Sequence, residues 1–426
     1  MNTKWYLILF LWGVCLGCTD KKSRTMQQDV VQQTDSINKE KDVNGWSRGN
    51  EIQVYEDILD FENNLSAFVS EISFVKLANE PSIRDFFVYD IQRNDQYIFL
   101  LGPNYLRQYD LEGNFIRQIG RAGQGPGEYI QLSAPLMLDN ENGLIYVCDG
   151  KLNRLFAYDF DGRFKKAVRI PEECYCVTRL DSSLIAVRTH CFHRYTPFSG
   201  KALQLMEYKG RIVKSFDSYL YPVPHKEGEH YGSEVNPLWN YQGDFYTLEY
   251  GNDTIYQVTK DALLPSTVLT GKRRMGKDDL FKKEQEDKLK IAGPVMKPNS
   301  YVFESNRFML FRMYSSTEIY HLLYDKKTGK MTRTGNQEKS YEFEYKGDKS
   351  KDFFIDDLVS GMVVDPLYQS DEWAIGLIPA MSIVEDRSHI IQYIDAHPTE
   401  EGAKLKAIIQ NMNEEDNSII CFIKLK

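Results

Sequence analysis

The sequence predicts an all-β protein, a six-bladed β-propeller whose blades have four strands each. Three observations lead to this expectation. Short β-rich runs recur six times at intervals of roughly 40 to 65 residues. A polar turn precedes each run, as in the second half of a hairpin. The repeat region ends with a unit that lacks a fourth strand and begins with a strand that belongs to no unit, so that joining the two would close the ring.

The six runs combine β-branched and aromatic residues, which favour half-buried strands. They occupy residues 97–101, 144–148, 184–188, 245–249, 307–311 and 373–377. Each of the first five is followed by another strand that ends near a tyrosine, then by a turn and a fourth strand. The turns at Gly113, Gly162 and Gly210 are the clearest, because glycine adopts the left-handed conformation that such turns require.

The ends of the repeat region predict how the ring closes. The sixth unit has a third strand at residues 417–424, and no fourth strand follows it. Residues 71–77 form a strand that belongs to no other unit. We therefore expect residues 71–77 to pair with residues 417–424 and to complete the sixth blade, which removes an unpaired sheet edge.

Two insertions interrupt the repeat, and their sequences predict short helices. Residues 278–290 form a charged amphipathic segment with an acidic first turn. Residues 396–413 contain a second candidate, which starts at Pro398-Thr399 and runs to Ile408-Ile409. Both are more typical of solvated packing helices than of partner sites.

The N-terminus has the features of an export signal. Lys4 precedes an apolar run at residues 5–16, which is too short to span a membrane but suits a secretory signal. Residues 15–18 resemble a bacterial lipobox, with Gly17 before the cleaved bond and Cys18 as the lipid-carrying residue; a buried apolar segment is the alternative. We expect a signal peptide at 1–17, a polar, flexible tether at 18–50 and the propeller at 66–426.

Residues 120–129, Gly-Arg-Ala-Gly-Gln-Gly-Pro-Gly-Glu-Tyr, carry a resemblance to a known group of proteins. They resemble the loop between successive blades in NHL-like and TolB-like six-bladed propellers. The chain as a whole, from about residue 66 to 426 and including the lipobox, is similar to propeller lipoproteins of Bacteroides-type bacteria. The resemblance implies the fold and a lipid anchor in the outer membrane, on its periplasmic or cell-surface side. It implies no ligand, because that family is largely uncharacterised.

The glycine run could alternatively bind a phosphate group. A phosphate-binding loop needs Gly-Lys followed by Ser or Thr at the start of a helix. Here Pro126, Gly127 and Glu128 follow, and the Glu128 carboxylate would repel a phosphate. Tight turns between blades explain these glycines better.

The predicted topology places a set of polar side chains on one face of the ring. Loops between second and third strands open on the same face as the loops that join successive blades, and they rim the central channel. That face is the default ligand site. The candidates there are Asn104, Tyr105, Arg121, Glu128, Asp149, Lys151, His190, His193, Asn252 and Tyr314. Such groups suit a sugar or a peptide, although polar loop residues also serve simply to meet water.

The cysteines predict one structural link and no metal site. Counting back from the turn at residues 181–183 brings Cys174 close to Cys191, so a disulfide between them is favoured over zinc binding at His190 and His193. Asp356, Asp357 and Asp365 could serve acid–base chemistry, but aspartates at strand ends are usually turn formers. We expect no metal and no cofactor.

These features favour a membrane-anchored binding or scaffold module for a glycan, peptide or protein partner over an enzyme. The alternative is a lyase or hydrolase that acts on a sugar or peptide at the mouth of the channel. The net charge of −9 argues against a nucleic-acid partner, which would require a basic face.

Overall fold

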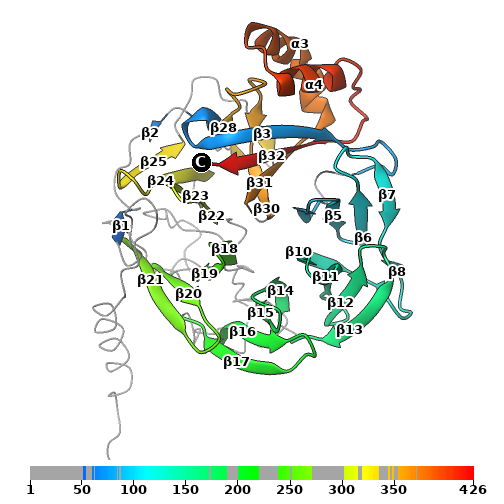
Figure 1. The fold of residues 1–426 in the computed structure, drawn as a ribbon, viewed down its shortest axis with the longest axis vertical. Helices are drawn as coiled ribbons and strands as arrows, with labels where there is room; N and C mark the ends of the chain where they lie inside the picture. Colours follow the sequence, from blue (N-terminus) through cyan, green and yellow to red (C-terminus); the bar gives the residue numbers. More distant parts are fainter. Residues whose placement is uncertain are drawn as a thin grey trace, which may run out of the picture.

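The computed structural model describes residues 51–53, 60–61, 63–83, 85, 88–171, 174–189, 200–219, 238–249, 252–270, 302–314, 319–334, 344–345, 348–349, 354–370 and 372–426. In these residues six small sheets stand around a common axis and form a closed ring (Figure 1). The predicted six-bladed propeller is confirmed.

Blades 1 to 3 are four-stranded antiparallel sheets whose first strand lies nearest the axis. Blade 1 contains β4 (Asp90–Arg93), β5 (Ile98–Gly102), β6 (Tyr105–Tyr109) and β7 (Phe115–Gln118). Blade 2 contains β10 (Leu132–Asp139), β11 (Leu144–Asp149), β12 (Arg154–Asp159) and β13 (Phe164–Arg169). Blade 3 contains β14 (Cys174–Arg179), β15 (Leu184–Thr189), β16 (Lys201–Glu207) and β17 (Ile212–Asp217).

Blades 4 and 5 follow the same plan. Blade 4 contains β18 (Leu238–Tyr241), β19 (Asp244–Leu248), β20 (Thr254–Val258) and β21 (Leu263–Thr270). Blade 5 contains β22 (Val302–Glu304), β23 (Phe308–Tyr314), β24 (Ile319–Asp325) and β25 (Lys330–Thr334). Two short hairpins stand between blades 5 and 6, namely β26 (Glu344–Tyr345) with β27 (Asp348–Lys349), and β28 (Phe354–Ile355) with β29 (Val363–Val364).

Blade 6 is built from both ends of the described chain, as the sequence predicted. Its inner strands are β30 (Pro366–Ser370), β31 (Trp373–Ile378) and β32 (Ile419–Leu425), and its outer strand is β3 (Val69–Lys76). β3 runs antiparallel to β32, with Ile72 opposite Ile423. Because β3 belongs to the start of the domain and β32 to its end, this pairing holds the ring closed.

The segment before β3 also pairs with the ring, which the sequence did not predict. β1 (Glu51–Gln53) adds in parallel to β21 of blade 4, and β2 (Asp60–Phe61) adds in parallel to β25 of blade 5. A 3-10 turn, η2 (Leu65–Ala67), then leads into β3. Ile52 is buried among residues of blades 4 and 5. This strap therefore follows the outer edge of three consecutive blades before it closes the ring.

The outer edges of blades 2 and 3 differ from that of blade 4 where the strap begins. Thr270 of β21 lies opposite Gln53 of the strap. At the equivalent position, blade 2 has Pro171, which has no N–H to donate. In blade 3 the N–H of Tyr219 already donates to the Glu249 carboxylate at 2.8 Å. A strap strand in this register can therefore pair with the outer edge of blade 4. It cannot pair in the same way with blades 2 and 3, where the corresponding N–H is missing or already bonded.

Two helices cover the outside of blade 6, between β31 and β32 (Figure 1). α4 (Glu400–Ile409) confirms the helix expected at residues 396–413, whereas α3 (Ala380–Ala396) was not predicted. The N–H of Phe74 in β3 donates to Glu401 at 2.9 Å, which fixes α4 to the closing strand. The helix expected at residues 278–290 lies outside the described residues.

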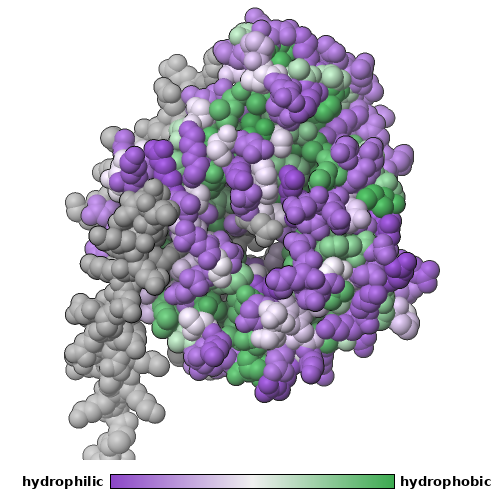
Figure 2. Space-filling model, viewed as in Figure 1, coloured by the Kyte–Doolittle hydropathy of each residue, from purple (hydrophilic) through white to green (hydrophobic). Residues whose placement is uncertain are grey.

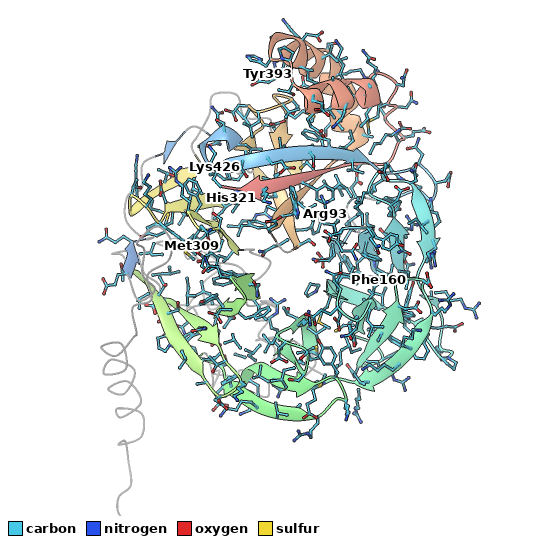
Figure 3. The ribbon with its side chains drawn as sticks, viewed as in Figure 1. Arg93, Phe160, Met309, His321, Tyr393 and Lys426 are labelled. Carbon is cyan, nitrogen blue, oxygen red and sulfur yellow. The ribbon has the colours of Figure 1, made fainter. Side chains whose placement is uncertain are left out.

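Side chains from neighbouring blades form the core at each seam. At the seam of blades 6 and 1, the Arg93 guanidinium carbon lies 4.9 Å from the ring centre of Trp373 and 4.6 Å from that of Phe422 (Figure 3). The Arg93 N–H also donates to the Ser370 hydroxyl at 2.9 Å. The guanidinium therefore joins the first blade to the last through aromatic stacking, while the Arg93 backbone supplies the hydrogen bond.

Gly113 allows a matched test of the closing geometry, because Gly243 shares its φ of +88°. A Cβ on Gly113 would lie 2.2 Å from the carbonyl oxygen of Lys76 in β3, whereas a Cβ on Gly243 would meet nothing within 4 Å. We expect Gly243→Ala to cost about 1 kcal/mol of unfolding free energy, through backbone strain alone. Gly113→Ala should cost roughly 3 kcal/mol, because the turn must also move away from β3. Urea denaturation measures both values, and equal losses would contradict the close contact.

Candidate ligand-binding face

The candidate face is the loop face, which carries the connections between second and third strands and the connections between successive blades. The turns that join first to second and third to fourth strands lie on the opposite, turn face. The space-filling view shows an opening at the centre of the ring, bordered mainly by hydrophilic residues (Figure 2). The structure gives the sequence-predicted residues different positions and roles around this opening.

Tyr105 lies at the start of β6, in the turn between second and third strands of blade 1. Its ring covers Gly102, where a Cβ would lie 2.2 Å from the ring carbon Cζ. The Arg107 guanidinium stacks 4.2 Å from the ring centre, and Arg107 also donates to the Ser82 carbonyl at 2.8 Å. Burial raises the pKa of Tyr105 to about 12. Tyr105 is therefore a neutral, rigidly held aromatic group on the loop face.

Asp149 ends β11, just before the loop between the second and third strands of blade 2, and its role is structural. The side chain is fully buried, and Oδ1 accepts the N–H groups of Lys151 and Leu152 at 2.8 and 2.9 Å. Oδ2 accepts the N–H groups of Ile130 and Gln131 at 2.5 and 3.2 Å. The carboxylate thus joins the loop from blade 1 to the loop within blade 2, and it shapes the face from beneath.

Arg121 and Glu128 lie at the outer rim of the ring rather than at the mouth of the channel. They belong to a small parallel pair, β8 (Arg121–Ala122) and β9 (Glu128–Tyr129), beside β13 (Figure 1). The Arg121 Nε is 2.6 Å from Glu128. The Tyr158 hydroxyl donates to the Gly127 carbonyl at 2.9 Å, which holds the loop against blade 2. The glycines therefore serve a tight turn between blades, in which the Glu128 carboxylate accepts the Gly125 N–H at 2.8 Å and only Arg121 is exposed.

The remaining candidates fall into two groups. Asn104 and Lys151 are exposed on the loop face, and Asn252 is half-buried there, with its side-chain oxygen 3.1 Å from the Thr254 N–H. Tyr314 ends β23 on the same face. His190, His193 and Cys191 lie outside the described residues, so the proposed Cys174–Cys191 link stays a prediction. Cys174 itself is buried and lies opposite Thr189.

Two side chains near the mouth of the channel, Tyr368 and Asp90, were not predicted from the sequence. Both lie at the seam of blades 6 and 1. Tyr368 of β30 donates its hydroxyl to the Val88 carbonyl at 3.1 Å. Burial raises the pKa of Tyr368, and the nearby negative charges of Asp90, Asp85 and Asp365 act in the same direction. Tyr368 and Asp90 both lie on the innermost strands of their blades. Because the innermost strands face the channel, this position could have identified Tyr368 and Asp90 as candidate site residues.

Asp365 and Asp356 were named as carboxylates with possible chemistry. Asp365 stands just before β30 and pairs with Arg312 at 3.2 Å, with both side chains mostly buried. Asp356 is buried, and it accepts the N–H groups of Leu358 and Val359 at 3.1 Å each. Asp356 is therefore a turn former, as expected for an aspartate at the end of a strand.

The buried carboxyl group of Asp90 should make the folding stability of the protein depend on pH. Burial raises its pKa to about 7, even though the N–H of Leu136 donates to it at 2.7 Å and Gln92 at 3.2 Å. A folded-state pKa above the unfolded value of about 3.9 means that this carboxyl contributes most stability below pH 4. The contribution is lost as the pH rises to about 7, by at most about 4 kcal/mol.

Asp90→Asn should remove this slope. Urea denaturation between pH 4 and pH 8 should give the parent chain a larger loss of stability with rising pH than the variant. Parallel curves for the two proteins would show that Asp90 is charged in the folded state throughout this range.

The described residues contain neither a cluster of metal ligands nor a helix that could cross a membrane. No three His, Cys, Asp or Glu side chains come together there in an arrangement that could hold a metal ion. Within the same residues, every helix is too short or too polar to cross a membrane.

The sequence matches, over residues 50–424, the family described as "Domain of unknown function (DUF4934)". The chain belongs to the DUF4934 family. The match includes both the strap and the closing strand, so the DUF4934 domain corresponds to the whole ring. No curated protein matches the sequence.

Solved structures resemble this DUF4934 chain in fold. A candidate exported protein from Bacteroides fragilis is 18% identical, with a TM-score of 0.59, and the match covers 88% of this chain and 99% of that one. A DUF4221 member from Bacteroides vulgatus is 11% identical with a TM-score of 0.42, covering 84% and 97%. Virginiamycin B lyase from Staphylococcus aureus is 13% identical with a TM-score of 0.38, covering 63% and 76%. The first of these supports the propeller fold of the DUF4934 domain.

Proposed function

We propose that this protein is an extracytoplasmic binding module that presents the loop face of its propeller to a glycan, peptide or protein partner. The observation that carries the proposal is the arrangement of Tyr105, Asn104 and Lys151 on adjacent loops of blades 1 and 2. An aromatic ring held in place by Arg107, beside exposed amide and ammonium groups, combines an apolar surface with hydrogen-bonding groups.

The state of the carboxylates on this face favours binding over hydrolysis. A hydrolase needs an acid and a base that can reach the substrate. Among the described residues, Asp149 is occupied by backbone N–H groups, Asp365 pairs with Arg312, and Asp90 is only 1% exposed. These groups shape the face and do not reach into the opening.

A binding screen tests the proposal. The chain from residue 18 onward, with Cys18→Ala, is applied to immobilised glycans and to peptides. Asn104→Ala combined with Lys151→Ala should weaken binding of the ligand found by about tenfold or more, since both side chains are exposed and their loss leaves the fold intact. Lys327→Ala is the matched control, because Lys327 is exposed in the turn between β24 and β25, on the turn face. Equal binding by the double variant and the control would overturn the assignment of this face.

We place the protein at the outer membrane, held by a lipid on Cys18. Support comes from the lipobox at residues 15–18 and from the Bacteroides fragilis structure, which is described as a candidate exported protein. Cys18→Ala should release the chain from the membrane fraction and remove the mass of the acyl chains. Retention with the same added mass would place the lipid on another residue.

A further inference from the structure

The outer strands of three consecutive blades expose large hydrophobic side chains near the turn face. Four of the seven such side chains that the described residues expose lie there, namely Phe164, Ile212, Val213 and Leu264, each between 39% and 46% exposed. We call these four residues the outer belt. Isolated exposed hydrophobic residues are ordinary, but the outer belt repeats a position from blade to blade.

The repetition is visible in the strand bounds. Phe164 and Ile212 are the first residues of β13 and β17, and Val213 and Leu264 are the second residues of β17 and β21. All four therefore stand where an outer strand leaves the turn between third and fourth strands. In the figures these strands form the lower margin of the ring, opposite α3 and α4, and hydrophobic residues interrupt the hydrophilic surface there (Figures 1 and 2).

The surroundings of the outer belt are basic in a protein that is acidic overall. Residues 159–169, 207–217 and 258–270 contain eight Lys and Arg and five Asp and Glu, against a net charge of −9 for the chain. Lys165, Lys166 and Lys214 are exposed on the same strands as the belt residues. Hydrophobic side chains among cations suit the interface of an anionic bilayer, where the former enter the headgroup region and the latter contact phosphates.

The path of the strap brings the predicted lipid anchor to this same side of the ring. Glu51 pairs with Val268 of β21, four residues from Leu264, which corresponds to about 13 Å along the strand. Upstream of Glu51, 32 residues lead back to Cys18. A chain of that length spans at most about 110 Å when fully extended, so an anchor on Cys18 keeps the outer belt within reach of the bilayer.

We propose that the outer belt rests on an anionic lipid bilayer and orients the ring on the membrane. In that orientation the turn-face side of blades 2 to 4 lies against the membrane, and α3 and α4 are on the opposite side of the ring (Figure 1). The loop face then points away from the bilayer and stays accessible to a ligand. This orientation rests on the proposed anchor at Cys18, whereas contact between the belt and lipid does not, which allows a test on chain without lipid.

Vesicle co-sedimentation of the chain from residue 18 onward, with Cys18→Ala, tests the contact. The vesicles contain equal amounts of phosphatidylglycerol and phosphatidylcholine, or phosphatidylcholine alone. We expect binding to the anionic vesicles that falls with added salt. Ile212→Ser combined with Leu264→Ser should weaken it by about tenfold, and Lys214→Gln by about fivefold.

Met381→Ser is the matched control. Met381 is 55% exposed on α3, on the opposite side of the ring, so its loss should leave vesicle binding unchanged. The proposal is overturned if the belt variant binds vesicles as the Met381 variant does, or if both lipid compositions bind equally. It is also overturned if the parent chain is a dimer in size-exclusion chromatography and the belt variant a monomer, because the belt would then be an interface between two copies. Each of these results leaves the ligand screen on the loop face unaffected.

Discussion

Ile72→Asp should abolish cooperative folding of the ring. Ile72 is 5% exposed in β3, opposite Ile423 of β32, and belongs to the core beneath α3 and α4. A carboxylate at this position has to lose its hydration or separate the two strands that close the ring, and either costs more than about 4 kcal/mol. Chemical denaturation should show a strongly lowered midpoint, or a chain that is unfolded in buffer.

Ser70→Asp is the control for this substitution, because Ser70 is exposed on the same strand. Its effect should stay below about 1 kcal/mol. Hydrogen exchange of the β32 amides adds a second readout, since loss of β3 exposes the outer edge of β32 to solvent. A fully cooperative transition at the parent midpoint in Ile72→Asp would contradict closure by the N-terminal strand.

Glu304→Ala should cost about 3 to 5 kcal/mol. The side chains of Glu304 and Lys326 are fully buried, with 2.8 Å between the ammonium and the carboxylate. Trp239 of blade 4 donates to the other Glu304 oxygen at 2.7 Å, and the Lys326 ammonium lies 3.9 Å from the ring centre of Tyr241. Removing the carboxylate leaves a buried cation without this counter-charge and deprives the Trp239 N–H of its acceptor.

The double variant Glu304→Leu with Lys326→Met separates the net contribution of the ion pair to stability from the cost of removing only one of its partners. A hydrophobic pair of similar volume avoids the desolvation of two charges, so the double variant should be more stable than Glu304→Ala. Thermal and urea unfolding of the three proteins measures this difference. A double variant no more stable than Glu304→Ala would show that breaking the charge pair of blade 5 carries no extra cost.

The sequence predicted the ring well because each blade has signals that are local in the chain. The six β-rich runs correspond to β5, β11, β15, β19, β23 and β31, and the turn glycines at 113, 162 and 210 have φ values between +83° and +89°. Closure was predictable because a unit with three strands and a strand without a unit have one simple solution. These inferences needed only spacing, alternation and turn chemistry.

The missed elements lack such signals. β1 and β2 contain three and two residues, and they are stabilised by the edges of β21 and β25 rather than by their own sequence. α3 begins directly after Pro379 with no side-chain cap and no acidic residue in its first turn. By contrast, Thr399 caps α4, with Glu400 and Glu401 in the first turn, and that helix was predicted.

The candidate site was predictable in its topology but not in the role of each side chain. Both the position of Arg121 and Glu128 at the rim and the burial of Asp149 depend on how the loop at 120–129 folds back against blade 2. Asp90 and Tyr368 come together because blades 1 and 6 are neighbours only after the ring has closed. Contacts that depend on closure carry no trace in the local sequence.

Mass analysis of the ligand after binding tests the central claim most directly. The ligand found in the screen is incubated with the Cys18→Ala chain at equal concentration, recovered, and weighed by mass spectrometry. A binding module predicts one ligand bound per chain and complete recovery at the original mass, with binding weakened by the Asn104 and Lys151 substitutions. Recovery of a cleaved or dehydrated product would show that the loop face is the site of a hydrolase or lyase.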